Sequence, residues 1–170
     1  MEIESELYKQ NPWWENKFKE RSVKREIYLK EIFRNLDSKV IIFLTGLRRI
    51  GKTTILKQII RQLLSKKIKP KDVLYLSLDS FNLLNYSIHQ LAEEYRKLHK
   101  KSALDFFYLF LDEVTARENF EQELKSLYDS ENMKIICSSS IATLMRDRKA
   151  FLTGRIKTIE VMPLTFQEFL

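Results

Sequence analysis

Two glycines five residues apart constrain this chain more than any other feature. The sequence contains only 3 glycines, where an average usage of about 7% would give roughly a dozen. Gly46 and Gly51 follow an apolar run at residues 40–45, and together with Lys52 and Thr53 they form the pattern G-x-x-x-x-G-K-T. This pattern is typical of a loop that joins a strand to a helix and binds phosphate groups.

Each residue type in this loop has a physical reason. Gly46 permits a sharp turn off the strand, and Gly51 lets backbone N–H groups converge on phosphate oxygens at the positive end of the next helix dipole. Lys52 supplies charge to the β- and γ-phosphates, and the Thr53 hydroxyl is a ligand for Mg²⁺. The alternative, a chance match in a turn, is rarer still in a chain so poor in glycine. We predict ATP-binding residues at Gly46, Arg48, Arg49, Ile50, Gly51, Lys52, Thr53 and Thr54.

Apolar runs alternate with amphipathic stretches along the chain. The runs predict strands at residues 40–45, 73–78, 106–111, 135–137 and 157–161. Helical spacing of apolar residues predicts helices at residues 16–36, 52–67, 87–101, 117–128 and 141–147. Strands that are apolar throughout are covered by helices on both faces. The expected fold is α/β, a three-layer αβα sandwich with a mostly parallel sheet, in one domain over residues 1–170 with an amino-terminal helical segment over about residues 1–38.

Two adjacent carboxylates follow the third apolar run. Asp112 and Glu113 come at the carboxyl end of that strand, where ligands bind in open α/β sheets, about sixty residues after the glycine loop. We expect Asp112 to hold Mg²⁺, directly or through water, and Glu113 to accept a proton from an attacking water. The alternative is an Asp-Glu pair that caps the next helix. A carboxylate beside the metal ligand favours water as the nucleophile, and therefore hydrolysis.

Composition excludes several classes of protein. Hydrophobic residues make up 44% and charged residues 31% of the chain, which is a globular composition. No apolar run is long enough to cross a membrane, and the single cysteine, Cys137, favours a reducing cytoplasm and a buried strand position. The net charge of +7 permits nucleic-acid binding, although the basic residues are spread along the chain and a plain solvated surface is the simpler interpretation.

These motifs resemble those of archaeal and bacterial AAA-type ATPases related to the STAND class. The resemblance rests on four segments: the loop at residues 46–58, the upstream helix with Tyr28-Leu29 and Leu36-Asp37, the Asp-Glu strand at residues 108–114, and Gly154-Arg155 followed by the sequence PLTFQEFL at residues 163–170. It runs from about residue 11 to residue 170, and its last segment is the most specific. It implies a P-loop core that binds ATP with Mg²⁺ and uses hydrolysis as a conformational switch.

The resemblance also implies roles for two further residues and for the rest of a longer protein. Ser139 matches a family serine that senses the γ-phosphate or orients the attacking water, although the serines at 138–140 could instead cap a helix. Arg155 matches an arginine that could reach the γ-phosphate within the chain or from a neighbouring subunit of a homo-oligomer, or it lies on the surface. Family members usually continue with a helical lid and often a winged-helix domain, which we expect to be absent from a chain ending at Leu170.

Other aromatic and basic residues have weaker interpretations. Trp13 and Trp14 could cover an adenine or a partner, but packing of an amino-terminal segment onto the core is the simpler explanation. Arg25 could approach the nucleotide from the first helix. The preferred hypothesis is an ATPase. The alternative is a nucleotide-dependent module that binds DNA or protein through the missing carboxy-terminal region with little turnover.

Overall fold

Five parallel strands form the centre of the molecule. The computed structural model describes residues 2–140 and 152–170. Its strands are β1 (Ile41–Thr45), β2 (Val73–Ser77), β3 (Phe107–Asp112), β4 (Met133–Ser139) and β5 (Ile156–Glu160). They lie in the order β2-β3-β4-β1-β5, and every neighbouring pair is parallel. The expected parallel α/β sheet is confirmed.

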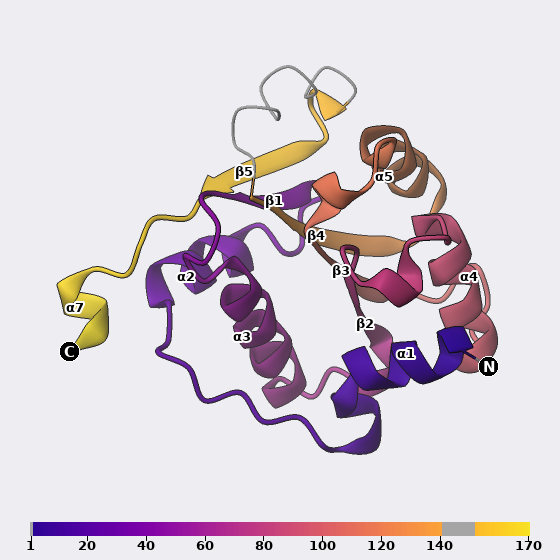
Figure 1. The fold of residues 1–170 in the computed structure, drawn as a ribbon, viewed down its shortest axis with the longest axis horizontal. Coiled ribbons are helices and arrows are strands. Elements are labelled where there is room, and N and C mark those ends of the chain that lie inside the picture. Colours follow the sequence, from indigo (N-terminus) through magenta and orange to yellow (C-terminus); the bar gives the residue numbers. More distant parts are fainter. Residues whose placement is uncertain (1, 141–151) are drawn as a thin grey trace.

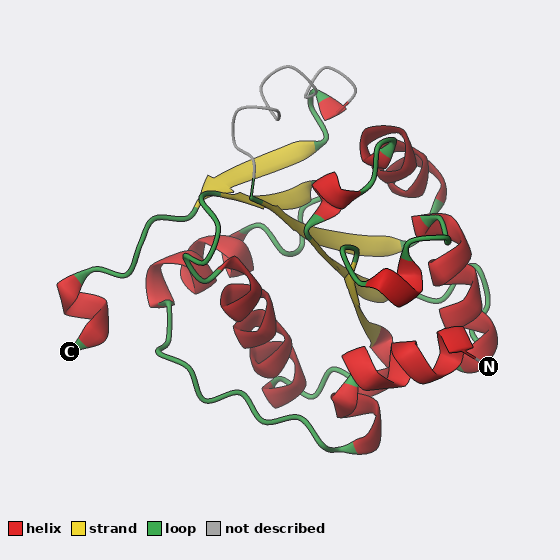
Figure 2. Cartoon of the chain, in the orientation of Figure 1, coloured by secondary structure: helices red, strands yellow, loops and turns green. Residues whose placement is uncertain are grey.

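Helices cover both faces of this sheet (Figures 1 and 2). The covering helices are α1 (Glu2–Gln10), α2 (Glu26–Arg34), α3 (Lys52–Ser65), α4 (Ile88–Leu98) and α5 (Phe120–Ser130), and the short α7 (Phe166–Phe169) lies away from the sheet. Helices α2 and α3 pack together on one face, α4 and α5 on the other, and α1 lies against β2. None of the helices within residues 2–140 and 152–170 is long and apolar enough to span a membrane.

The segment before α2 differs from the prediction of one helix over residues 16–36. The described helix begins only at Glu26, and an extended linker precedes it. The side chain of Gln58, on α3, accepts a hydrogen bond from the backbone N–H of Arg25 at 3.0 Å and donates to the carbonyl of Val23 at 2.7 Å. Tertiary contacts thus satisfy the linker backbone, and local periodicity does not show them. The helix expected at residues 141–147 lies outside the described residues.

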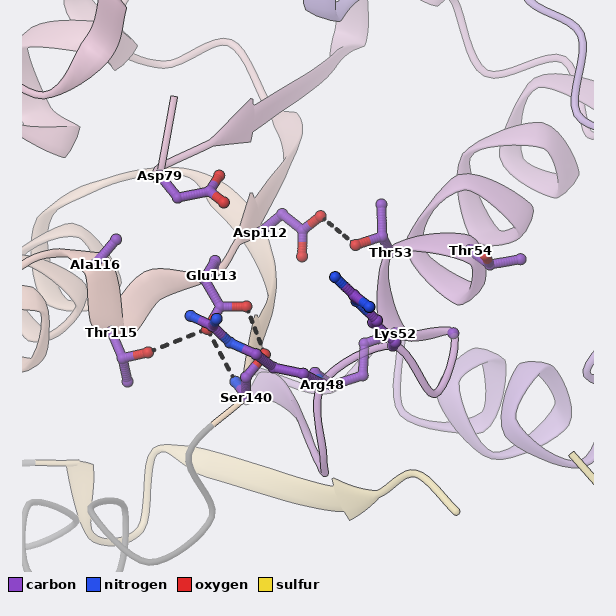
Figure 3. A pocket seen from close by; sticks show the side chains of 12 residues that line it. Arg48, Lys52, Thr53, Thr54, Asp79, Asp112, Glu113, Thr115, Ala116 and Ser140 are labelled. Atoms are coloured by element: carbon purple, nitrogen blue, oxygen red, sulfur yellow. Dashed lines mark hydrogen bonds between the residues drawn. The ribbon is translucent and has the colours of Figure 1, made fainter. Parts of the chain in front are cut away.

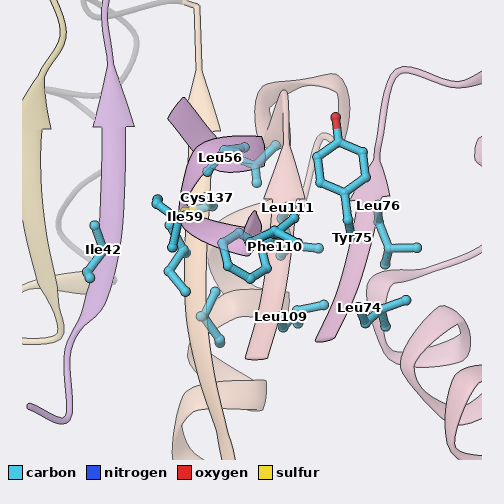
Figure 4. Packing of buried hydrophobic residues seen from close by; sticks show 14 of the residues in the cluster. Ile42, Leu56, Ile59, Leu74, Tyr75, Leu76, Leu109, Phe110, Leu111 and Cys137 are labelled. Atoms are coloured by element: carbon cyan, nitrogen blue, oxygen red, sulfur yellow. The ribbon is translucent and has the colours of Figure 1, made fainter. Parts of the chain in front are cut away.

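The hydrophobic core extends over both faces of the sheet, and one part of it lies between the sheet and α3. All five residues of β1 are buried, and Ile55, Leu56 and Ile59 of α3 are fully buried against the strands (Figure 4). Cys137 lies within this packing on β4, where burial raises the pKa of its thiol well above the ordinary value. The prediction of an unreactive buried cysteine is consistent with this position.

The amino-terminal segment covers the edge strand β2. The buried Asn11 side chain accepts a hydrogen bond from the N–H of Tyr75 at 2.7 Å and donates to its carbonyl at 2.9 Å, as a neighbouring strand would. The indoles of Trp13 and Trp14 both donate to the carbonyl of Val73. An uncovered edge strand invites association with other chains, so this segment protects the sheet. Trp13 and Trp14 therefore pack onto the core, as the simpler interpretation expected.

Asn11→Ala should lower the free energy of unfolding by about 2–4 kcal/mol. The substitution leaves both the N–H and the carbonyl of Tyr75 without their partner, and each unsatisfied buried group costs about 1–3 kcal/mol. Urea unfolding measures this difference. Asn85→Ala is the matched control, because that side chain is exposed and its loss should change stability by less than about 0.5 kcal/mol. Equal stability of the two variants would contradict the role given to Asn11.

His99 should make the fold sensitive to acid. Its ring packs against Trp14 and Tyr95, and its Nε2 atom is buried with no hydrogen-bond partner within the described part of the chain. Burial lowers the pKa of His99 to about 4, with Lys71 and Lys101 acting in the same direction and Asp72 against it.

Because the unfolded chain takes up a proton near pH 6.5 and the folded chain does not, stability should fall as the pH drops from about 7 towards 4. Between pH 7.5 and pH 5 the loss due to this group should be about 1 kcal/mol, after allowance for the partial exposure of the ring. Urea unfolding of the protein and of His99→Gln at both pH values measures it. Identical pH dependence in the two proteins would exclude this role for His99.

Candidate active site

A cleft of about 560 Å³ opens at the carboxyl ends of the strands, a size within the usual range for ligand pockets. It is lined by residues of the glycine loop, by the acidic pair and by Ser140 after β4. Figure 3 shows Lys52 and Thr53 on one side of the cleft and Asp112 and Glu113 on the other. The parallel sheet brings these segments together because the ends of β1, β3 and β4 meet at the same edge.

Both glycines of the loop have backbone conformations that a side chain would strain. Gly46 has φ +149° and Gly51 has φ +98°. A Cβ atom at Gly46 would also lie 2.6 Å from the carbonyl oxygen of Val161, too close for a real contact. Gly51 caps the amino terminus of α3, so the free N–H groups of that helix face the cleft. The loop has the geometry expected for binding an anion at a helix terminus.

Lys52 lies inside the loop, with only 5% of the residue exposed. Its Nζ atom donates hydrogen bonds to the carbonyls of Gly46 and Leu47. Desolvation lowers the pKa of Lys52, while the charges of Glu113 and Asp112 oppose that shift. The loop carbonyls therefore hold the Lys52 ammonium at the place where phosphate oxygens would bind.

Asp112 is held by three hydroxyl groups. Its Oδ2 atom accepts hydrogen bonds from Thr53 Oγ1 and from Tyr75 Oη, both at 2.7 Å, and its Oδ1 atom accepts one from Ser138. A hydroxyl and a carboxylate that meet in this way are the hard oxygen ligands that Mg²⁺ prefers. The donor set of Thr53 and Asp112 therefore fits a magnesium ion bound together with phosphate oxygens.

The Glu113 carboxylate has different hydrogen-bond partners from the Asp112 carboxylate. Its backbone is left-handed, with φ +56°. Its carboxylate accepts hydrogen bonds from the N–H of Ser140 at 3.0 Å, from the hydroxyl of Ser140 at 2.7 Å and from that of Thr115 at 3.3 Å. The two adjacent carboxylates thus have separate partners, as different roles would require.

A protein-family model described as an AAA domain matches residues 38–170. The chain belongs to this family. Among curated relatives, this AAA domain is 30% identical over 152 residues to an uncharacterized protein of Haemophilus influenzae, covering 87% of this chain and 37% of that protein. It is 34% identical over 135 residues to an uncharacterized protein of Methanocaldococcus jannaschii, covering 79% of this chain and 28% of that protein. The chain thus spans about a third of the length of these relatives.

Solved AAA-type structures share the fold. The Hsp104–ADP complex of S. cerevisiae matches with a TM-score of 0.64 at 17% identity, covering 98% of this chain and 25% of that one. DnaA of Aquifex aeolicus, bound to AMPPCP, matches with a TM-score of 0.51 at 22% identity, covering 90% of this chain and 50% of that one. The expected P-loop, AAA-like core is confirmed by these similarities.

Most of the predicted site residues of this AAA domain line the cleft, but Arg155 does not. Arg155 precedes the amino end of β5, where its Nε atom pairs with Asp129 Oδ1 at 3.2 Å, whereas the cleft lies at the carboxyl ends of the strands. The structure therefore does not bring Arg155 to the phosphate loop of its own chain. Gly46, Ile50 and Ser139 do not line the cleft, although Ser139 donates to Thr115 beside it. The lining residues from the prediction are Arg48, Arg49, Gly51, Lys52, Thr53, Thr54, Asp112 and Glu113.

Sequence analysis missed several residues around this AAA domain's acidic pair. Ser138 and Ser140 bind the two carboxylates, whereas the prediction had chosen Ser139 between them. The alternation of side chains along a strand was the signal that could have identified both, because residues two apart share a face. Tyr75 and Lys57 carried no such signal: the Lys57 ammonium lies 3.4 Å from the centre of the Tyr75 ring, and burial lowers its pKa to about 8.

Proposed function

We propose that this AAA domain binds ATP with Mg²⁺ and hydrolyses it, and that hydrolysis serves as a conformational switch. One observation carries the proposal. The Thr53 hydroxyl of the glycine loop meets the Asp112 carboxylate at 2.7 Å, with a second carboxylate on the next residue. A metal ligand pair beside a potential base, at the mouth of a phosphate loop, matches the requirements of phosphoryl transfer to water.

Each residue then has a defined task. The loop N–H groups and Lys52 hold the β- and γ-phosphates, and Thr53 and Asp112 hold Mg²⁺. When bound, Mg²⁺ neutralises charge that develops on the phosphate oxygens. Glu113 accepts the proton of the attacking water, for which it must exchange its bonds to Ser140 and Thr115 for a bond to water.

The solved neighbours support the choice of ligand. The DnaA structure contains AMPPCP and the Hsp104 structure contains ADP, both adenine nucleotides. A relation to the STAND class, a cytoplasmic location and assembly into a homo-oligomer, in which Arg155 could reach a neighbour's site, stay predictions.

A second candidate function is a nucleotide-dependent module that binds DNA or protein. Its support is the carboxy-terminal segment, where Phe166, Phe169 and Leu170 are exposed to solvent. Such side chains are suited to packing against another polypeptide, whether a partner or a further part of a longer protein. In this hypothesis ATP occupancy sets the conformation of the segment and turnover is slow or absent.

Phosphate release from MgATP separates the two functions. It should be measured on this chain and on a longer form of the length of its relatives, each beside its Lys52→Ala variant. Release that depends on Lys52 in either form supports the ATPase. ATP binding without release in both forms would favour the binding module, and absence of ATP binding would contradict both.

A further inference from the structure

Arg25 joins three separate parts of the chain although it lies outside the cleft. It caps the amino terminus of α2 and is only 2% exposed. Its Nη1 atom donates to the carbonyl of Ile50 in the phosphate loop at 3.0 Å. Its Nη2 atom donates to the carbonyl of Met162 at 2.7 Å, and its Nε atom donates to Glu168 Oε1 at 2.8 Å. One buried guanidinium thus binds the phosphate loop on one side and the carboxy-terminal segment on the other.

The two loop glycines lie close to Arg25 and to the start of the carboxy-terminal segment. A Cβ atom at Gly51 would lie 3.3 Å from Arg25 Nη1, and one at Gly46 would lie 2.6 Å from the carbonyl oxygen of Val161. Val161 in turn donates its N–H to the carbonyl of Thr45, at the end of β1. The loop is therefore enclosed between Arg25 and the passage at residues 161–162, so its path depends on both.

The carboxy-terminal segment is fixed mainly by Arg25 and its neighbour Tyr28. Tyr28 Oη accepts the N–H of Met162 at 2.9 Å, and the Arg25 guanidinium lies 4.8 Å from the centre of the Tyr28 ring. Glu168 belongs to α7 through a capping box with Thr165, and most other side chains of residues 162–170 are exposed. Figure 1 shows α7 beyond the end of β5, away from the sheet and on the side of α2.

We propose that Arg25 is a positioning residue that fixes the phosphate loop to residues 162–170 and passes changes in the loop to that segment. The part of this inference that concerns nucleotide rests on the proposed function. Lys52 gives two of its three donor hydrogens to the carbonyls of Gly46 and Leu47, so a phosphate that binds this ammonium acts directly on this end of the loop. The Ile50 carbonyl then carries the change to Arg25, and from there to Met162 and Glu168. Because coupling between two sites is reciprocal, altering residues 162–170 must also alter the loop.

Two variants break the link between the phosphate loop and residues 162–170, one at Arg25 itself and one at its partner on α7. Arg25→Lys keeps the charge but has one ammonium in place of three spaced donor nitrogens, so it cannot reach all three acceptors. Glu168→Ala leaves Arg25 and every cleft residue in place, and it removes the acceptor on α7 together with the bonds that Glu168 accepts from Thr165. Gln167→Ala is the matched control, since it changes the exposed neighbour in the same short helix. If Arg25→Lys fails to fold, Glu168→Ala still tests the proposal.

Amide hydrogen exchange of the nucleotide-free chain gives the first measurement. We expect the amides of residues 47–53 to exchange at least about fivefold faster in Arg25→Lys and in Glu168→Ala, the lower end of common coupling between sites. Gln167→Ala should leave the loop unchanged. Parental exchange of the loop in both Arg25→Lys and Glu168→Ala would overturn the proposal. A purely local role for Glu168 in α7 would predict that result, with faster exchange confined to residues 162–170.

The second measurement adds ATP with Mg²⁺. In the parent we expect ATP to change exchange in residues 162–170, and we expect Glu168→Ala to lose that response and to bind ATP at least about fivefold more weakly. A response of residues 162–170 that persists undiminished in Glu168→Ala would contradict transmission through Arg25. If the parent binds no ATP, the proposed function fails, whereas the nucleotide-free exchange of the loop still decides whether Arg25 fixes it.

Discussion

Glu113→Gln should lower the rate of ATP hydrolysis by about 10²–10⁴-fold, the usual contribution of a general base. Glutamine keeps the size of the side chain and can still accept hydrogen bonds from Ser140, but it cannot take a proton from water. ATP and Mg²⁺ should bind as before, because Asp112 and Thr53 are unchanged. Steady-state phosphate release, measured in a form of the protein that turns over ATP detectably, gives the rate, and equilibrium titration gives the affinity.

The control for this variant is Glu118→Gln, which removes an equivalent charge from an exposed position nearby. It should hydrolyse ATP at the parental rate. If Glu113→Gln also hydrolyses ATP at the parental rate, the base lies elsewhere and the mechanism is wrong. Asp112→Asn should act differently and weaken the binding of ATP in the presence of Mg²⁺, since the metal loses a charged ligand.

Lys52→Ala should lower the affinity for ATP by at least about 100-fold, while the domain stays folded. Charge-assisted contacts contribute about 1.5–3 kcal/mol each, and Lys52 is placed to make several to phosphate oxygens. Among the residues that the structure describes, its ammonium donates hydrogen bonds to the carbonyls of Gly46 and Leu47, within the loop itself. Fluorescence titration with ATP measures the affinity, and thermal unfolding measures the fold.

Lys69→Ala is the matched control, since it removes a lysine that is exposed and away from the cleft. It should bind ATP with the affinity of the parent. Parental affinity in Lys52→Ala would contradict the assignment of the phosphate loop, and loss of the folded state in Lys52→Ala would contradict its assignment as a purely nucleotide-binding residue.

The fold could be predicted from local sequence because its determinants are local. The apolar runs at residues 40–45, 73–78 and 106–111 mark strands that are buried almost throughout, and the glycines at 46 and 51 mark a loop in which both have positive φ. The position of the acidic pair beside the glycine loop could be predicted from strand direction, since the carboxyl ends of parallel strands lie at one edge of the sheet. These features need no knowledge of the tertiary contacts.

The remaining features depend on contacts between distant residues. The linker before α2 is extended because Gln58, 33 residues away from Arg25, satisfies its backbone. Ser139 was predicted from its match to a family serine, whereas the bonds of Ser138 to Asp112 and of Ser140 to Glu113 depend on how β4 lies against β3. The role of Tyr75 requires knowing that β2 lies beside β3, and that of Arg25 requires knowing that residue 168 returns to α2.

Calorimetric titration of ATP with Mg²⁺ into this chain tests the central claim most directly. The structure places one phosphate loop, one Thr53–Asp112 ligand pair and one cleft of suitable size together within the described residues. We predict saturable binding of one ATP per chain that weakens when Mg²⁺ is removed by a chelator. Absence of saturable binding, or binding of equal strength in Lys52→Ala, would contradict the claim that this cleft is a nucleotide site.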